Sequence, residues 1–197
     1  MKKINKFIFK TLFLFSLFFS ANAENNILRI GDLNAKVTVK VFSSLTCPHC
    51  ANFHTEVFNK LKNDFINKNL VKFEHHAFPL DLAALNAEII LRCHSDNDKK
   101  FLMLEKIYES QSKWAIGSDI NKINESIKKI GKAVDMTNNK MDSCLEDNRV
   151  QDDILNQRIN AQKKYKIEST PTILINEKKY TGKIDYEQFK RAIEKKL

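Results

Sequence analysis

The chain has 197 residues, a formal net charge of +9, 43% hydrophobic residues and four cysteines. This length corresponds to one domain, and the apolar fraction is ample for one core. The lysines are scattered, mostly at helical spacing beside acidic residues, which is typical of a solvated face. No basic patch interleaved with aromatic residues occurs, and this argues against a protein that binds nucleic acid.

Residues 1–23 have the three-part pattern of a secretory signal peptide. A lysine-rich start precedes an apolar run over 11–19, and Ala21-Asn22-Ala23 offers small residues for cleavage. The alternative is an uncleaved membrane anchor, but the apolar stretch is shorter than the roughly 20 residues of a spanning helix. We therefore expect a mature chain that begins at Glu24, resides in the periplasm and has its cysteines exposed to oxidation.

Two strands and a helix are predicted in the first part of the mature chain. Residues 35–42 alternate apolar and polar side chains, as a half-buried strand does. After the CPHC tetrapeptide at 47–50, apolar residues recur at spacings of three and four and predict an amphipathic helix: Phe53, Val57, Phe58, Leu61 and Phe65. Residues 67–69 break this helix. Residues 70–78 predict the second strand, which Pro79 ends because proline has no N–H to donate.

The stretch from Leu82 to about Ala161 has helical periodicity almost throughout. Its apolar stripes contain Leu82, Leu85, Ile89 and Cys93; Phe101, Leu104, Ile107 and Tyr108; Ile120, Ile123, Ile127 and Ile130; and Ile154, Leu155 and Ile159. Gly131 and residues 137–139 are expected to separate the helices. This pattern predicts a block of packed helices rather than further strands.

The C-terminal part returns to strands. Residues 172–175 predict a strand, 176–179 a turn, and Tyr180 and Thr181 the start of the return strand. A last helix is marked by apolar residues at helical spacing: Tyr186, Phe189 and Ile193. This order of elements predicts an α/β protein with a mixed (α+β) sheet.

The tetrapeptide Cys47-Pro48-His49-Cys50 lies where the first strand gives way to the helix. The first thiol of such a pair lies near a helix N-terminus, where free N–H groups and the helix dipole favour the thiolate. His49 can add a donor or a positive charge to the same thiolate. A stable thiolate makes the disulfide reactive, so the pair tends to donate its disulfide to another protein. The spacing alone also suits zinc sites.

Together with the signal peptide and Ser169-Thr170-Pro171-Thr172, the tetrapeptide resembles the DsbA family of exported thiol–disulfide oxidoreductases. Residues 43–54 and 78–81 are similar to its alphaproteobacterial, Com1-like branch. The dipeptide Pro48-His49 is the DsbA form of the motif, distinct from the Gly-Pro of thioredoxins. The resemblance covers essentially the whole mature chain.

This resemblance implies a thioredoxin fold with an inserted all-helical subdomain. The thioredoxin-fold domain would contain residues 24–81 and 161–197, and the insert residues 82–160. The expected catalytic residues are Cys47, Cys50, His49 and Pro48, and the prediction includes no cofactor and no bound metal.

The resemblance also assigns roles to individual residues. It implies that Cys47 is the exposed attacking thiol and that Cys50 is the buried resolving thiol. Pro171 is expected in the cis form, facing the cysteine pair, with the backbone of Thr170 able to bind an extended peptide. The alternative is an ordinary trans proline that opens a strand.

The chain departs from the family pattern at two positions. Thr170 is polar where strongly oxidising relatives often have valine, which leaves open how strong an oxidant the protein is. Val41 stands six residues before Cys47, where relatives often place an acid that moves the proton of the resolving thiol. The nearby titratable candidates are Glu74, His75 and His76, and the alternative is that these residues simply lie at a solvated edge of the sheet. Consecutive strand residues point to opposite faces, so the two histidines cannot both face the site.

Three other residues have two interpretations. His54 follows Cys50 by one helical turn; it could complete a partial copper or zinc site with Cys47 and Cys50, but a partly solvated helix face is the expectation. Cys93 and Cys144 both fall in the helical insert. They are expected to pair as a structural disulfide, although two free buried thiols are the alternative.

The leading functional hypothesis is a periplasmic oxidoreductase that introduces disulfide bonds into exported proteins. Its expected partners are cysteine-containing exported proteins and a membrane reoxidant resembling DsbB, and it is expected to be a monomer. The alternatives are a disulfide isomerase or reductase, a thioredoxin-fold metallochaperone, or a non-enzymatic surface protein.

Overall fold

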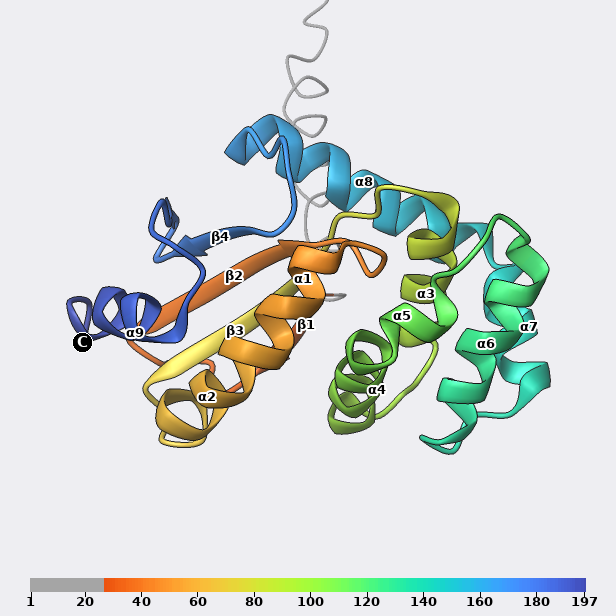
Figure 1. Cartoon of the computed structure of the whole chain (residues 1–197), viewed down its shortest axis with the longest axis horizontal. Helices are drawn as coiled ribbons and strands as arrows, with labels where there is room; N and C mark the ends of the chain where they lie inside the picture. Colours follow the sequence, from red (N-terminus) through yellow and green to blue (C-terminus); the bar gives the residue numbers. More distant parts are fainter. Residues whose placement is uncertain (1–26) are drawn as a thin grey trace, which may run out of the picture.

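A mixed five-stranded sheet forms the centre of the computed structural model, which describes residues 27–197 (Figure 1). The strand order is β1-β3-β2-β4-β5. The strands are β1 (Leu28–Ile30), β2 (Val37–Ser43), β3 (Val71–Ala77), β4 (Thr172–Ile175) and β5 (Lys178–Lys179). β2 and β3 are parallel and the other pairs are antiparallel, so the sheet is mixed, as the sequence predicts. The predicted signal peptide lies outside the described residues.

The sequence did not predict β1. It contains only three residues, Leu28–Ile30, and pairs antiparallel with β3 at the edge of the sheet. An alternating pattern cannot be recognised over three residues, because two repeats of the strand period need at least four. Pairing with β3 therefore defines this strand, rather than its own sequence.

Strand register divides the sheet into two faces. Residues paired across the strands point the same way, and neighbours along a strand point to opposite faces. The α1 face carries Val39, Val41, Phe73, His75 and Ile173. The α8 face carries Lys40, Phe42, Glu74, His76 and Leu174.

One continuous helical segment follows β2 and covers the α1 face. It consists of α1 (Pro48–Phe53), the π-helical turn η1 (His54–Phe58), α2 (Asn59–Leu61) and a second π-helical turn η2 (Lys62–Ile66). It ends at Ile66, and Asn69 in the turn that follows has a left-handed backbone (φ 60°). Its apolar stripe and α9 (Tyr186–Glu194) pack into the main core. The helix is as expected, but its π turns are not visible in the apolar pattern.

The helical block runs from α3 to α8 and lies largely to one side of the sheet (Figure 1). Its helices are α3 (Leu82–Arg92), α4 (Asn97–Glu109), α5 (Gln111–Trp114), α6 (Ile120–Lys132), α7 (Asn138–Leu145) and α8 (Asn148–Tyr165). α8 crosses the α8 face, where Ala161 and Ile167 pack with Phe42, Phe78 and Leu174.

Two details of the helical block differ from the sequence prediction. Residues 137–139 begin a helix: the Thr137 side chain accepts a hydrogen bond from the Lys140 N–H and caps α7. Threonine occurs at helix N-caps as well as in loops, so the sequence alone did not distinguish the start of a helix from a break between helices. The expected end of the insert at residue 160 falls inside α8, which continues to Tyr165.

The C-terminal hairpin is tighter than predicted. Asn176 and Glu177 both adopt the left-handed region (φ 47° and 66°) and form the turn by themselves, so β5 begins at Lys178 rather than at Tyr180. Two-residue hairpin turns require this conformation. Asn176 is suited to it, and its side-chain oxygen accepts a hydrogen bond from the Thr38 N–H at 2.7 Å.

Candidate active site

Cys47 occupies the N-cap position of α1. Its backbone is extended (φ −78°, ψ 119°), and its carbonyl accepts hydrogen bonds from the N–H groups of Cys50 and Ala51 at 3.0 and 3.1 Å. Pro48 begins the helix, a position that suits proline because the missing N–H would have no partner there. The Cys47 thiol therefore lies at the positive end of the helix dipole.

Hydrogen bonds to its sulfur favour the thiolate form of Cys47. The hydrogen bond from the Cys50 thiol lowers the pKa of Cys47 most, and the backbone N–H groups of Cys50 and His49 lower it further. Burial acts in the opposite direction, and the resulting pKa of Cys47 is about 5. The His49 side chain is exposed, and its backbone rather than its imidazole lowers the pKa. Cys47 is a thiolate at neutral pH.

Cys50 differs from Cys47 in its preferred charge. Both are buried free thiols, Cys50 with none of its surface exposed and Cys47 with 8%, so the expectation that Cys47 is exposed was wrong. Burial, the hydrogen bond to Cys47 and the negative charge of Cys47 raise the pKa of Cys50 far above its usual value. Three residues apart in the chain, the two thiols therefore have different charges at neutral pH: Cys47 is charged and Cys50 keeps its proton.

Thr170 and Pro171 face this pair. The peptide bond between them is cis, and the carbonyl oxygen of Thr170 lies 3.3 Å from Cys47 Sγ. Pro171 is followed directly by β4, whose residue Ile173 pairs with Val41 of β2. The sheet thus holds the Thr170 backbone beside the reactive sulfur.

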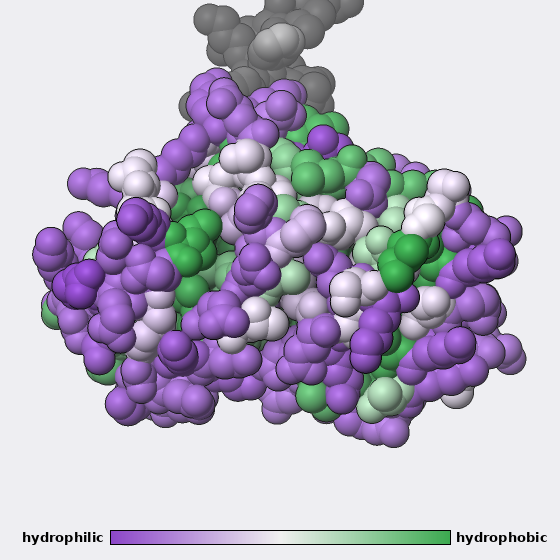
Figure 2. Space-filling model, in the orientation of Figure 1, coloured by the Kyte–Doolittle hydropathy of each residue, from purple (hydrophilic) through white to green (hydrophobic). Residues whose placement is uncertain are grey.

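A cleft of about 620 Å³ lies next to the cysteine pair. It is lined by His49, Asn52, Phe53, Glu56, Thr170, Pro171 and Ile184. Ile184 is 43% exposed, so the wall of the cleft offers an apolar contact. Figure 2 shows that hydrophobic residues on this side of the molecule gather in separate patches among mostly hydrophilic ones.

Sequence reasoning missed Gln111, which joins the helical block to the active-site loop. From α5, its side-chain nitrogen donates to the carbonyl oxygens of Leu45 and Cys47 at 2.8 and 3.0 Å. The side chain is buried, so these two bonds fix the loop before Cys47. No pattern in the sequence indicates a contact between residues 64 and 66 positions apart.

The two β3 histidines lie on opposite faces, as the strand periodicity predicts. His75 lies on the α1 face, beside Val41 in the register, and its Nε2 is 3.1 Å from Glu88 Oε2. His76 lies on the α8 face, and its Nε2 is 3.0 Å from Glu74 Oε2. Only His75 is on the face that carries the cysteine pair, and Glu88, which the sequence did not suggest, is its partner.

His54 does not lie on a solvated face, and that expectation was wrong. Its side chain is 3% exposed, and its ring packs against Tyr108 (4.3 Å between centroids) and Phe58 (4.8 Å). The packing partner Tyr108 comes from α4, so burial of His54 depends on the helical block. Among residues 27–197 no group of three or more His, Cys, Asp or Glu side chains is arranged to hold a metal ion.

Cys93 and Cys144 form a disulfide, with 6.0 Å between their Cα atoms. It joins the end of α3 to α7 and closes a segment of 51 residues. Both partners lie in the helical block, in elements other than the one that carries Cys47.

The fold and the cysteine pair define a thioredoxin-type protein, and the family comparisons agree. The family model described as thioredoxin matches residues 23–195, so the chain belongs to the thioredoxin family. Disulfide bond formation protein D of Bacillus subtilis is 32% identical over 177 residues, which cover 85% of this chain and 76% of that protein.

Two further relatives have the same type of name or structure. A Rickettsia bellii protein, named as a protein-disulfide oxidoreductase, is 28% identical over 78% of this chain, which spans 58% of that protein's length. The crystal structure of Wolbachia pipientis alpha-DsbA1 superposes with a TM-score of 0.79 at 25% identity, covering 87% of this chain and 90% of that one. Within the family the relatives are thus of the DsbA type, and the predicted fold class is confirmed.

Along residues 27–197 no helix combines the length and the apolar character that crossing a membrane requires.

Proposed function

We propose that the protein is a thiol–disulfide oxidoreductase that introduces disulfide bonds into exported proteins through Cys47 and Cys50. The observation that carries this proposal is the opposite behaviour of the two thiols. The pKa of Cys47 falls to about 5, and that of Cys50 rises far above its usual value. A pair whose reduced form contains a stable thiolate gives up its disulfide readily.

In the proposed reaction a client thiolate attacks Cys47 Sγ of the Cys47–Cys50 disulfide. The disulfide bond breaks, its electron pair leaves on Cys50 Sγ, and a mixed disulfide joins the client to Cys47. A second client thiolate then attacks the client sulfur and releases Cys47 as the thiolate that its site favours. The client loses two electrons and the cysteine pair gains them.

Thr170 and the neighbouring cleft are the proposed client-binding site. The Thr170 carbonyl lies 3.3 Å from Cys47 Sγ, so a client strand that pairs with this backbone would present its cysteine to Cys47. His49 and Pro171 line the same cleft. Its mixed polar and apolar lining suits unfolded segments of varied sequence.

The proposed location is the periplasm, and the proposed reoxidant is a membrane partner resembling DsbB. Support comes from the signal-peptide pattern of residues 1–23 and from the disulfide between Cys93 and Cys144, since such bonds persist in oxidising compartments. The name of the Bacillus subtilis relative supports the direction of disulfide formation. We propose that the protein acts as a monomer.

Two measurements test the oxidase proposal. Absorbance near 240 nm, which follows the thiolate, should persist to about pH 5, and a Cys47 that titrates near the free value of about 8.5 would contradict the proposal. Equilibration with glutathione should give a potential nearer the about −120 mV of DsbA than the about −270 mV of thioredoxin. A thioredoxin-like potential would instead indicate a reductase.

An isomerase or reductase is the second candidate, because the residue before Pro171 is the polar Thr170 rather than valine. Its backbone, 3.3 Å from Cys47 Sγ, lies where it can influence how fast a client leaves. Refolding of a protein with scrambled disulfides separates the two roles: an oxidase acts on the reduced client only. A metal-content assay on the reduced protein tests the metallochaperone alternative.

A further inference from the structure

A second pocket shares a wall with the cleft of about 620 Å³ beside Cys47, since Pro171 and Ile184 line both hollows. This second hollow, the lysine pocket, has a volume of about 250 Å³. The loop from α8 to β4 lines one side of it, and the loop from β5 to α9 lines the other. Its charged lining residues are Lys166, Glu168 and Lys179.

A short stretch of backbone joins the reactive sulfur to the lysine pocket. Thr170, whose carbonyl oxygen lies 3.3 Å from Cys47 Sγ, is at one end of this stretch. Ser169 and Glu168 precede it in the chain and line the lysine pocket. A client strand that pairs with Thr170 would run along this backbone. At a rise of about 3.3 Å per residue, a client residue about two to four positions from the reacting cysteine would reach the pocket.

Lys179 is held in place at this pocket. Strand register places it opposite Leu174, on the α8 face of the sheet. Its neighbour Lys178 lies opposite Ile175, on the α1 face. The Nζ atom of Lys179 donates to the carbonyl oxygen of Lys166, just past the end of α8, at 2.8 Å. An ammonium group has three donors, so this bond orients the group and leaves two donors for a ligand.

Positive charge exceeds negative charge in the lysine pocket. Its lining contains two ammonium groups and one carboxylate, that of Glu168. Among residues 27–197, neither Lys166 nor Lys179 forms an ion pair with a carboxylate. The surrounding stretch 161–184 contains six lysines and two glutamates, a net charge of +4. The field around the pocket is therefore positive and attracts an anionic group.

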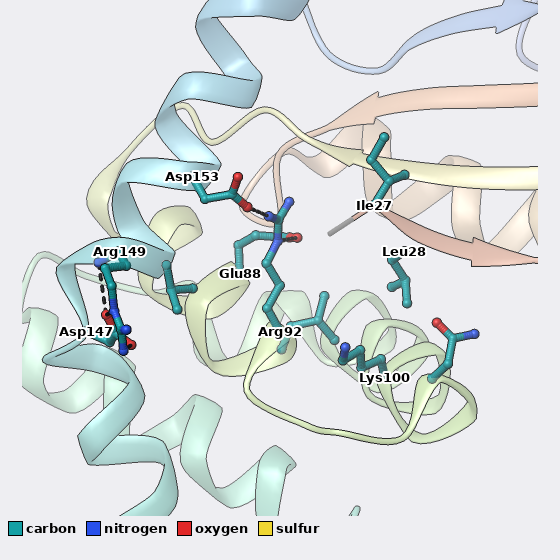
Figure 3. A pocket seen from close by; sticks show the side chains of 11 residues that line it. Ile27, Leu28, Glu88, Arg92, Lys100, Asp147, Arg149 and Asp153 are labelled. Atoms are coloured by element: carbon teal, nitrogen blue, oxygen red, sulfur yellow. Dashed lines mark hydrogen bonds and ion pairs between the residues drawn. The ribbon is translucent and has the colours of Figure 1, made fainter. Parts of the chain in front are cut away.

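The pocket between α3, α8 and β1 has a different arrangement of charge. Its volume is about 390 Å³, and charged side chains of both signs line it. Figure 3 shows Arg92 of α3 pointing toward Asp153 of α8, to which it donates at 3.1 Å. Arg149 lies beside Asp147 and donates to it at 2.8 Å. Here the protein itself supplies a carboxylate for each arginine, whereas in the lysine pocket the carboxylate has to come from a ligand.

We propose that the lysine pocket is a second client subsite, which binds an acidic side chain about two to four residues from the reacting client cysteine. This inference rests on the proposed function, since Cys47 has to hold that cysteine. Lys166 and Lys179 supply the ammonium groups that pair with the client carboxylate. The preference depends on the side of the cysteine, because Glu56 lines the cleft beside Cys47 and repels a carboxylate there.

The test is the second-order rate constant with which single-cysteine peptides in excess reduce the oxidised protein, measured by acid quench. The peptides differ only in having Glu, Gln or Lys three residues from the cysteine, in one set on its N-terminal side and in another on its C-terminal side. Each rate is divided by the rate of the same peptide with glutathione disulfide, which removes differences in thiol reactivity. In one set only, the Glu peptide should react about three- to tenfold faster than the Gln peptide, which is roughly the contribution of two exposed ion pairs.

Variants of the lysines test which charges produce this preference. The double variant Lys166→Gln/Lys179→Gln should bring the ratio of Glu to Gln rates close to one, and Lys166→Arg/Lys179→Arg should keep it high. Lys163→Gln/Lys178→Gln is the matched control, since it removes the same charge from two residues outside the pocket lining, and its ratio should equal that of wild type. A preference that the control also loses, or one that is equal in both peptide sets, would reduce the effect to general attraction by a basic protein and overturn the subsite.

The Gln peptides separate failure of the subsite from failure of the proposed function. If they reduce the Cys47–Cys50 disulfide readily but Glu and Gln peptides of both sets react at one rate, the function stands and the subsite is overturned. If they react no faster with the protein than with glutathione disulfide, the oxidase function is contradicted, and the subsite with it.

Discussion

Two buried carboxylates, one on each side of the sheet, have nearly the same partners. Glu88 lies 3.1 Å from His75 and accepts from Arg92 at 3.1 Å, and Glu74 lies 3.0 Å from His76 and accepts from Arg29 at 3.2 Å. The histidines are consecutive residues of β3. The pKa of each carboxylate is about 2.

The surroundings of the two groups differ. Glu74 has further cations, with Lys72 Nζ at 3.6 Å and Lys40 Nζ at 3.9 Å, and it lines a polar surface pocket of about 340 Å³. Glu88 contacts His75, which lies on the α1 face and whose side chain has no exposed surface. A carboxylate, an imidazole and a guanidinium therefore form part of an ion network beside a surface pocket on one face, and a buried group on the other. Location, rather than residue type, distinguishes the two groups.

The largest difference is expected in stability when each carboxylate is removed. Glu88→Gln removes the carboxylate partner of the buried His75 and leaves the 11%-exposed Arg92 with Asp153 as its remaining carboxylate partner, and should cost about 3–5 kcal/mol of unfolding free energy. Glu74→Gln leaves Arg29 and the lysines, which remain 17–27% exposed and can be hydrated, and should cost about 1–3 kcal/mol. Urea denaturation measures both values. Equal losses would show that the two environments do not differ energetically.

The second prediction concerns the helix that carries Glu88. Cys93 follows α3 directly, so its disulfide with Cys144 fixes the end of the helix that places Glu88 and Arg92. Replacing both cysteines with alanine should cost about 3–4 kcal/mol and lower Tm by about 10 °C. Peptide oxidation should largely survive, whereas Cys47→Ala should abolish it without lowering the stability of the reduced protein.

Mass spectrometry of the unreduced protein decides the connectivity on which this prediction depends. Oxidised protein digested without reduction should yield a peptide that links Cys93 to Cys144. A peptide that links either of them to Cys47 or Cys50 would contradict the structural role and place the helical block in the path of the electrons.

A third prediction is the acid sensitivity that both carboxylates confer. Burial alone would raise the pKa of Glu88, but His75 and Arg92 outweigh it and hold the value near 2, against an ordinary 4.5. That difference corresponds to about 3 kcal/mol, present above pH 4.5 and lost as the pH falls toward 2. Unfolding free energy measured from pH 6 to pH 2 should fall less steeply in Glu88→Gln, and Glu74→Gln should show a similar change. An unaltered slope would contradict the depressed pKa values.

The comparison also shows which features the sequence could predict. Residues 35–42, the helix after Cys50 and the strand at 172–175 follow from apolar spacing, since each is a local pattern that the structure confirms. The helix N-terminus at Cys47 follows from the same patterns. Strand alternation alone separated His75 from His76.

Features that depend on distant contacts could not be predicted in this way. His54 was expected to be solvated, but the ring of Tyr108 covers it. Tyr108 belongs to the helical block, so the sequence around His54 gives no sign of this contact. Glu88 has no distinguishing signal in the sequence, and only the packing of α3 against β3 pairs it with His75. Gln111 carries no signal in the chain at all, because two carbonyl groups more than 60 residues away define its role.

The smallest expected effect contrasts the two histidines that pack among aromatic rings. His54 has no partner for its ring nitrogens, so His54→Phe should raise the unfolding free energy by about 1 kcal/mol near pH 8. His76 packs against Phe42, with ring centroids 4.7 Å apart, but also pairs with Glu74, so His76→Phe should lower the unfolding free energy instead. Opposite signs for one substitution would reflect the difference in hydrogen bonding between the sites, a carboxylate partner for His76 and none for the ring nitrogens of His54 in the described residues.

The pH dependence of His54→Phe gives that contrast a second, independent measure. Burial, and then the nearby His75, hold the pKa of His54 well below 6.5, so the folded protein keeps this ring neutral while the unfolded chain binds a proton. Wild-type stability should therefore decline by up to about 1.4 kcal/mol per pH unit below pH 6.5 through His54 alone. Denaturation curves at pH 8, 6 and 5 should show the advantage of His54→Phe widening as the pH falls. A constant difference between the two proteins at all three pH values would mean that His54 is not held neutral in the core.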